Sequence, residues 1–289
     1  MTSAPLILMT VLTLLLSACT RHLGAPAAPP PARPAQPWTV ERDLGFTPAG
    51  WPQALQADLY RPLGEGPHPA VLLIHGGGWE RGDREQVQGI AWRLAEAGYL
   101  VMNTTYRFAP AHRFPAQLED VQAAVRWLRS PAGRERGVDP ARIAAFGYSA
   151  GAHLAALLGA TPAVAGLGDP ATAVQAVVAG GTPSDLTKYG GGTLVPQLIG
   201  GPRRSHIEQF RRASPVFHVT PAHPPTFLYH GGLDTLVGPD HAQDYYDLLR
   251  QNGVEAELFL LRGRGHITAF LTDGPAVRAA IAFLDRQLR

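Results

Sequence analysis

Residues 143–158 place a serine between an apolar strand and a helix, and this arrangement constrains the fold more than any other stretch. The apolar run Ile143–Phe146 precedes Gly147-Tyr148-Ser149-Ala150-Gly151, and residues 152–158 read as a helix. The flanking glycines let the two elements approach closely, and the tight turn lifts the hydroxyl onto the end of a sheet. The stretch predicts an exposed Ser149 at the positive end of a helix.

The five-residue pattern is weak evidence when taken alone. With 32 glycines in 289 residues, a chance match is expected in roughly one such chain in ten. A nucleophilic serine also needs partners, so the residues at the other strand ends decide the interpretation.

Apolar runs alternate with helical patterns from residue 38 onward. Strands are expected at 39–46, 55–60, 70–74, 99–103, 143–146, 174–179, 226–229 and 257–261, and helices at 86–97, 116–128, 152–158, 240–252 and 276–287. The first two strands read as an antiparallel pair. The alternation predicts an α/β fold with a mostly parallel central sheet of about eight strands, flanked by helices. Ligands bind such sheets at the carboxyl ends of the strands.

A glycine loop, His75-Gly76-Gly77-Gly78-Trp79, follows the strand at 70–74. Its glycines allow backbone N–H groups to face a cavity without side chains in the way, which an oxyanion hole requires. The plainer alternative is a flexible turn. A nucleotide-phosphate loop is disfavoured because no Lys-Ser/Thr pair or G-x-G-x-x-G pattern follows.

Asp234 and His266 each lie in a loop just past a strand, and both come later in the chain than Ser149. The order Ser, Asp, His at successive strand ends matches a known arrangement of catalytic triads. His153 falls one helical turn after the serine and is expected to pack rather than react. No pair of histidines has a metal-binding spacing such as H-E-x-x-H.

These stretches together resemble the α/β-hydrolase esterases with a His-Gly-Gly-Gly loop, namely the hormone-sensitive-lipase-like and the acetyl- and feruloyl-esterase-like groups. The resemblance runs from about Ala54 to the end of the printed sequence. It is carried by residues 75–79 with Gly82-Asp83, 106–110 with 114–116 and Asp120, 147–153, 213–215, 230–237 and 263–266. Ala111, where lipase-like members often carry Glu, and the elbow Gly-Tyr-Ser-Ala-Gly-Ala-His favour the acetyl- and feruloyl-esterase side.

The resemblance implies acyl transfer through a covalent intermediate. Ser149 is expected to attack an ester carbonyl, His266 to take and return the proton, and Asp234 to orient His266. The backbone N–H of Ala150 and, by resemblance, those of Gly77 and Gly78 form the oxyanion hole. No cofactor or metal is implied.

Residues 182–225 form a long connection between two expected strands, in the place where this fold carries a cap. Four apolar residues of this insertion either line the substrate pocket or only pack the cap: Leu194, Leu198, Ile199 and Phe210. Because the cap is short and not strongly apolar, an esterase for small acyl groups is favoured over a long-chain lipase.

The amino-terminal residues resemble a targeting signal. Residues 5–16 are nearly all apolar but too few to span a bilayer comfortably, and Leu16-Ser17-Ala18-Cys19 resembles a bacterial lipobox in which Cys19, the only cysteine, is lipidated. A plain signal peptide or a buried segment is the alternative. We therefore expect a lipoprotein-type signal at 1–19, a Pro/Ala-rich tether at 20–37 and one catalytic domain at 38–289.

The expected location is the bacterial cell envelope. Thr20 after the cysteine favours the outer membrane or the periplasmic face, by resemblance to lipoprotein sorting. A formal net charge of +2 with 17% charged residues gives no electrostatic case for nucleic acid.

The leading interpretation is a serine carboxylic-ester hydrolase for short-acyl, aryl or sugar esters, including those of polysaccharides. Three alternatives remain: an arylformamidase, a serine peptidase, and a catalytically silent tethered binding module. The residues do not define the acyl or alcohol group, the oligomeric state, the membrane that carries the anchor, or whether the cap moves.

Overall fold

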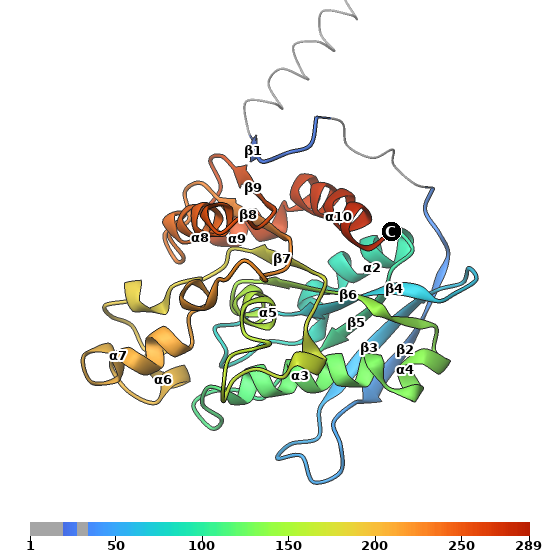
Figure 1. Cartoon of the computed structure of the whole chain (residues 1–289), viewed down its shortest axis with the longest axis horizontal. Coiled ribbons are helices and arrows are strands. Elements are labelled where there is room, and N and C mark those ends of the chain that lie inside the picture. The colour runs from blue at the N-terminus through green and yellow to red at the C-terminus, as the bar shows by residue number, and fades with distance from the viewer. Residues whose placement is uncertain (1–19, 28–33) are drawn as a thin grey trace, which may run out of the picture.

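The structure is a computed structural model that describes residues 20–27 and 34–289 (Figure 1). In this part of the chain nine strands form one sheet in the order β1-β9-β8-β7-β6-β4-β5-β3-β2. The strands are β1 (Thr20–Leu23), β2 (Trp38–Gly45), β3 (Gln56–Pro62), β4 (His68–Ile74), β5 (Leu100–Thr104), β6 (Val138–Tyr148), β7 (Ala176–Gly180), β8 (Thr226–Gly231) and β9 (Ala256–Leu261). The predicted mostly parallel sheet is confirmed.

The parallel strands end in register at one edge of the sheet. Ile74 of β4 pairs with Gly147 of β6, Tyr148 pairs with Gly180 of β7, and Gly231 of β8 pairs with Leu261 of β9. The loops after β4, β6, β8 and β9 therefore meet at this edge, which we call the catalytic edge because it carries the residues predicted to react.

Helices cover both faces of the sheet, as the alternation predicts. They are α2 (Gln88–Glu96), α3 (Ala116–Arg129), α4 (Pro131–Glu135), α5 (Ala150–Ala160), α6 (Leu194–Ile199), α7 (Arg203–Arg212), α8 (Asp240–Gln251), α9 (His266–Leu271) and α10 (Gly274–Leu288). Short 3₁₀ helices cover 84–87, 170–172, 186–188 and 215–218. No helix in the described residues is both long and apolar enough to cross a bilayer.

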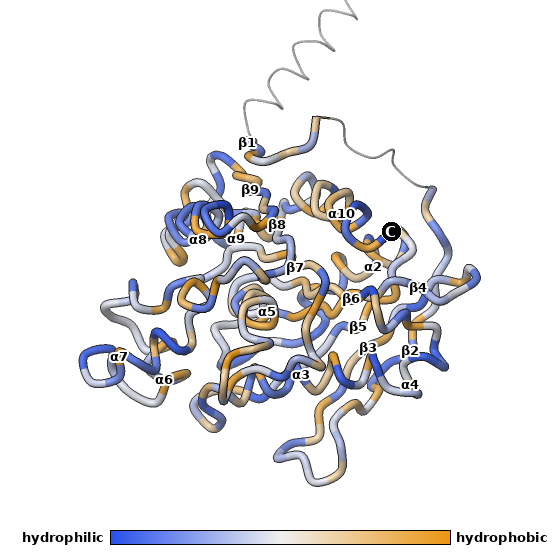
Figure 2. Tube along the Cα trace, in the orientation of Figure 1, coloured by the Kyte–Doolittle hydropathy of each residue, from blue (hydrophilic) through white to orange (hydrophobic). Residues whose placement is uncertain are grey.

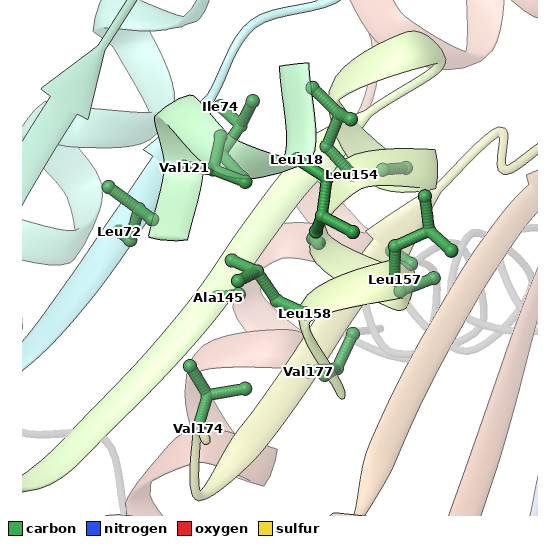
Figure 3. Close-up of a cluster of buried hydrophobic side chains, with 14 of the residues drawn as sticks. Leu72, Ile74, Leu118, Val121, Ala145, Leu154, Leu157, Leu158, Val174 and Val177 are labelled. Carbon is green, nitrogen blue, oxygen red and sulfur yellow. The ribbon is translucent and has the colours of Figure 1, made fainter. Parts of the chain in front are cut away.

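Each face of the sheet has its own apolar core because successive side chains of a strand point in opposite directions. Leu72 and Ile74 of β4 pack with α3 and α5 on one face (Figure 3), whereas Val71 and Leu73 pack on the other face, with residues of α2 and α10. Helix α5 is apolar along its length and lies inside the protein (Figure 2), and all of its residues are buried. Burial of each such large side chain contributes about 1.5–3 kcal/mol.

The first four residues of the predicted tether at 20–37 belong to the sheet. Thr20–Leu23 instead form β1, which pairs antiparallel with β9 at the end of the sheet (Figure 1). The His22 ring contacts those of Phe227 and Phe259, and its Nε2 lies 2.7 Å from Glu257 Oε2. Four residues without a strand pattern join the sheet because β9 offers a free edge and a buried carboxylate, and both features lie far away in the sequence.

The cap insertion leaves the sheet after β7 and returns at β8. It carries α6 and α7 and packs beside α5 (Figure 1). Leu198, Ile199 and Phe210 are buried in the core on this side, so they pack the cap. Leu194 alone of the four apolar residues named above lines the cavity described below.

Candidate active site

Ser149 occupies a sharp turn between β6 and α5. Its φ is 55° and its ψ is −122°, a conformation that costs free energy for a residue with a side chain and that recurs at functional sites. A Cβ at Gly147 would collide with the backbone of Gly151, and a Cβ at Gly151 would collide with the carbonyl oxygens of Ile74 and His75. Both glycines of the motif are thus required for the turn to pack against β4.

The structure brings the three predicted reactive residues into one hydrogen-bonded chain. His266 Nε2 lies 2.9 Å from Ser149 Oγ, and His266 Nδ1 lies 2.6 Å from Asp234 Oδ2. With Asp234 ionised, Nδ1–H donates to the carboxylate, so Nε2 is free to accept the serine proton. His266 and Asp234 are both buried.

A second histidine contacts the same carboxylate. His230 is fully buried; its Nε2–H donates to Val237 O at 2.8 Å and lies 3.3 Å from Asp234 Oδ2. The other oxygen, Oδ1, accepts from the backbone N–H groups of Leu236 and Val237. Burial opposes ionisation, but the hydrogen bonds from His230 and His266 outweigh it and hold the pKa of Asp234 well below its usual range.

The glycine loop lies directly against the serine turn. Gly77 and Gly78 have φ values of 109° and 63°, which favour glycine, and a Cβ at Gly76 would lie 3.3 Å from Ser149 Cβ. Both Gly77 and Gly78 line the cavity beside Ala150. The hydrogen bonds found among the described residues leave the N–H groups of Gly78 and Ala150 without an acceptor. They are therefore available to a ligand.

Two aromatic contacts hold this loop in place. His75 stacks on Tyr106 at 4.6 Å, and the Tyr106 hydroxyl donates to the carbonyls of His75 and Gly76 at 3.2 Å. At the other end of the loop, Trp79 Nε1–H donates to His153 Nδ1 at 3.1 Å. His75 and Trp79 therefore brace the glycine loop at its two ends.

His153 joins the glycine loop, α5 and the cap. Because Trp79 can only donate, His153 Nδ1 accepts and its Nε2–H donates to Ala213 O at 2.6 Å. Burial lowers the pKa of His153 to about 4, so the ring is neutral at pH 7. The two ring nitrogens of His153 bond to Trp79 and Ala213, whereas the Ser149 hydroxyl bonds to His266. This arrangement fits the predicted packing role of His153.

Tyr148, the residue before the serine, holds the backbone of His266 in place. Its hydroxyl donates to the backbone carbonyl of His266 at 2.6 Å, and the two rings lie 5.2 Å apart. Burial raises the pKa of Tyr148, so the hydroxyl keeps its proton. This contact couples the two loops that carry the nucleophile and the histidine.

A cavity of about 400 Å³ opens over Ser149 and His266. Its walls come from the glycine loop, from the cap and from the two loops after β8 and β9. They include Trp79, Tyr189, Leu194, Val195, Leu236 and Ile267. Such a mostly apolar cavity with a few polar groups suits a small organic molecule.

Other motif residues prove to be structural. Arg107 and Asp120 form a buried pair, with Arg107 Nε 2.8 Å from Asp120 Oδ1, and Trp51 Nε1–H donates to the same oxygen. This pair fixes the start of α3 behind the glycine loop. Among the described residues no group of three His, Cys, Asp or Glu side chains stands close enough to hold a metal ion. Cys19, the predicted lipidation site, lies outside the described residues.

Two supporting residues were not assigned a role from the sequence. His230 stands four residues before Asp234, but the chain offers no local sign that its ring turns toward the carboxylate. In the sequence, Tyr148 served only to distinguish between groups of esterases, and its bond to His266 O spans 118 positions. The Tyr148 contact depends on which strands are neighbours in the sheet, whereas the His230 contact depends on how the loop after β8 folds back on its own strand.

Comparison with known proteins identifies a family for this chain. Residues 57–249 match the BD-FAE family. The probable carboxylic ester hydrolase LipM of Mycobacterium tuberculosis is 33% identical over 75% of this chain and 53% of its own length. Esterase LipC of the same organism is 31% identical over 76% of this chain and 59% of its own length. The chain thus spans about half the length of these curated relatives.

Solved structures show the same fold. A truncated carbohydrate esterase from gut microbiota superposes with a TM-score of 0.76 at 24% identity, over 89% of this chain and 98% of that one. A thermophilic esterase from Thermogutta terrifontis superposes with a TM-score of 0.71 at 23% identity, over 88% and 93% of the two chains. At these identities the likeness concerns the fold alone.

Proposed function

The chain belongs to the BD-FAE family of α/β-hydrolase esterases, and from that premise we propose that it is a serine carboxylic-ester hydrolase that works through an acyl-enzyme. The observation that carries this proposal is the continuous hydrogen-bonded chain from Ser149 Oγ through His266 to Asp234 at the wall of an apolar cavity. Curated relatives described as ester hydrolases support it.

The first half-reaction forms the acyl-enzyme. Ser149 Oγ attacks the ester carbonyl carbon while His266 Nε2 takes its proton, and Asp234 stabilises the resulting imidazolium. The carbonyl oxygen becomes an oxyanion held by the N–H groups of Ala150, Gly77 and Gly78. His266 then returns the proton to the leaving alkoxide as the C–O bond breaks.

The second half-reaction releases the acid. Water enters, His266 takes one of its protons, and the hydroxide oxygen attacks the acyl carbon. The tetrahedral intermediate collapses, Ser149 Oγ receives the proton from His266, and the carboxylic acid leaves. No group beyond those of the chain and water is needed to balance these steps.

The proposed substrates are short-acyl, aryl or sugar esters, of small molecules or of polysaccharides. A cavity of about 400 Å³, with Leu194 of the cap in its wall, favours a small acyl group. Leu194 also lies against the glycine loop, because a Cβ at Gly78 would lie 3.1 Å from its side chain.

A panel of p-nitrophenyl esters tests the substrate class. We expect turnover with acetate to butyrate to exceed that with palmitate by about tenfold or more, because the extra methylenes do not fit the cavity. Acetylated xylan, a feruloyl ester and N-formylkynurenine, assayed alongside, separate sugar esters, aryl esters and the arylformamidase alternative. Preferred hydrolysis of palmitate or of N-formylkynurenine would contradict the proposal.

The same proposal includes a lipid anchor at Cys19 that holds the enzyme in the bacterial envelope. Its support is the sequence: an apolar run at 5–16 followed by small residues and the only cysteine.

Radiolabelled palmitate checks the anchor. Cells that produce the wild-type chain are expected to yield a labelled protein, and cells that produce Cys19→Ala are expected to yield none, because acylation of a lipoprotein requires the thiol. Equal labelling of the two chains would remove the lipoprotein claim without affecting the esterase.

A further inference from the structure

Strand β1 brings the chain to the catalytic edge of the sheet. It pairs antiparallel with β9, and Thr20 lies opposite Leu261, the last residue of β9. The next residues, Arg262–Gly265, lead into His266. Thr20 therefore lies about 4.8 Å from the strand end that carries the catalytic histidine loop.

Thr20 is held close to the sheet by the contacts of its neighbour His22. His22 is held by the buried Glu257, which also pairs with Arg286 of α10, and by ring contacts to Phe227 and Phe259. Thr20, the residue that follows the proposed lipidation site Cys19 in the sequence, is thus held beside the catalytic edge.

An exposed apolar surface lies on the same edge. Eight large apolar side chains are exposed among the described residues, and four of them lie in the two segments after β8 and β9. These four, which we call the apolar rim, are Leu233, Leu236, Ile267 and Leu271. Each is more than half exposed, which is unusual for grouped leucine and isoleucine side chains in water.

The two segments that carry the rim contact one another. Leu233 N–H donates to Arg264 O, which joins the two segments. Ile267 and Leu271 are one turn apart on α9 and so share a face, while Leu236 and Ile267 both line the mouth of the cavity.

The exposed charges within the two segments that carry the rim are positive, and Glu80 and Arg81 line the cavity beside them. Residues 231–238 and 262–272 contain two arginines, Arg262 and Arg264, which are exposed or half-buried. The one carboxylate in these segments, Asp234, is buried in the site. Apolar side chains interspersed with cations fit the surface of a bilayer that contains anionic lipid.

We propose that the apolar rim docks on a phospholipid bilayer, so that the mouth of the catalytic cavity faces the membrane surface. This inference adds a docking surface to the proposed esterase and takes its orientation from the proposed anchor. Attachment at Cys19 keeps the rim at high local concentration beside the bilayer, so that four side chains suffice for docking.

Lipid-attached quenchers test the orientation in the full chain. Leu233→Cys and Leu63→Cys are each labelled with an environment-sensitive fluorophore and reconstituted in phosphatidylglycerol–phosphatidylcholine vesicles that carry nitroxide lipids. Leu63 is an equally exposed leucine that follows β3 at the opposite edge of the sheet. We expect quenching at position 233 to exceed that at position 63 by about threefold or more. Equal quenching, or stronger quenching at 63, would overturn the proposal.

A second substitution tests the rim itself. In the chain labelled at 233, Leu271→Glu should reduce quenching by about half or more because it places a charge at the interface, whereas Leu63→Glu should leave quenching unchanged. Neither leucine lines the cavity, so hydrolysis of a water-soluble ester should stay within about twofold and confirms that the fold is intact. Unchanged quenching in Leu271→Glu contradicts the docking surface.

Two further outcomes separate this inference from the proposals it builds on. Quenching requires no turnover, so an inactive enzyme that still docks would contradict the esterase alone. If the label at 233 already reports an apolar environment without vesicles and light scattering shows a dimer, the rim is an interface between two copies and the docking proposal fails. The mass of the Cys19 peptide reports acylation independently.

Discussion

Ser149→Ala is expected to lower kcat for p-nitrophenyl acetate by about 10⁴–10⁶-fold and to abolish the burst of p-nitrophenol. The hydroxyl is the atom that forms the acyl-enzyme, and His266 Nε2 has no other group on this turn to deprotonate. The fold should persist, because alanine keeps the Cβ that fits between the glycine loop and β7. Burst kinetics with the purified full chain measure the effect.

The matched control is Ser205→Ala. Ser205 is exposed on α7 of the cap, and its hydroxyl bonds to Pro202 O, just before the helix, and to the His206 ring. Its loss should leave the burst and kcat unchanged. A Ser149→Ala protein that retains the burst with a normal thermal unfolding curve would show that another residue is the nucleophile.

Asp234→Asn is expected to lower kcat/KM by about 10⁴-fold at neutral pH. Asparagine can donate to His266 Nδ1 where the carboxylate can only accept, so the proton moves to Nε2 and that atom no longer accepts from Ser149. The imidazolium formed in the transition state also loses its counter-charge. The measurement is kcat/KM for a short-acyl ester between pH 5 and pH 9.

The pH profile of the unmodified enzyme follows from the same carboxylate. The hydrogen bonds from His230 and His266 hold the pKa of Asp234 well below its usual range, so Asp234 stays ionised throughout this interval. Any loss of activity on acidification therefore arises from another group.

The control for Asp234→Asn is Asp247→Asn, which changes an exposed aspartate on α8 and should leave kcat/KM unchanged. An Asp234→Asn enzyme with more than about a tenth of normal activity would contradict the triad assignment.

The positions of the reactive residues were predictable because each follows a strand that the sequence marks clearly. Ser149, Asp234 and His266 stand just past β6, β8 and β9, and the parallel arrangement forces their loops to one edge. The glycine loop was predictable for a different reason: three successive glycines leave the backbone N–H groups uncovered by side chains, and the positive φ values at Gly77 and Gly78 favour glycine. Their roles in catalysis remain predictions that the two variants above will test.

The supporting contacts were not predictable to the same degree. Tyr148 contacts His266 only after distant strands have paired, and His230 contacts Asp234 only after the loop after β8 has folded back on its strand. The strand β1 was also missed, since Thr20–Leu23 have no strand pattern of their own and find their place through Glu257 and the open side of β9.

The sequence by itself determined the class of fold, the order of the reactive residues and the need for glycine around the serine, because these depend on local periodicity and on backbone sterics. Only the tertiary structure decided the second histidine on Asp234, the place of Leu194 in the cavity wall and the position of Thr20 beside the apolar rim. The first depends on how the loop after β8 folds back on the end of its own strand. The other two join segments far apart in the chain, and such contacts are decided by which strands pair and in what register.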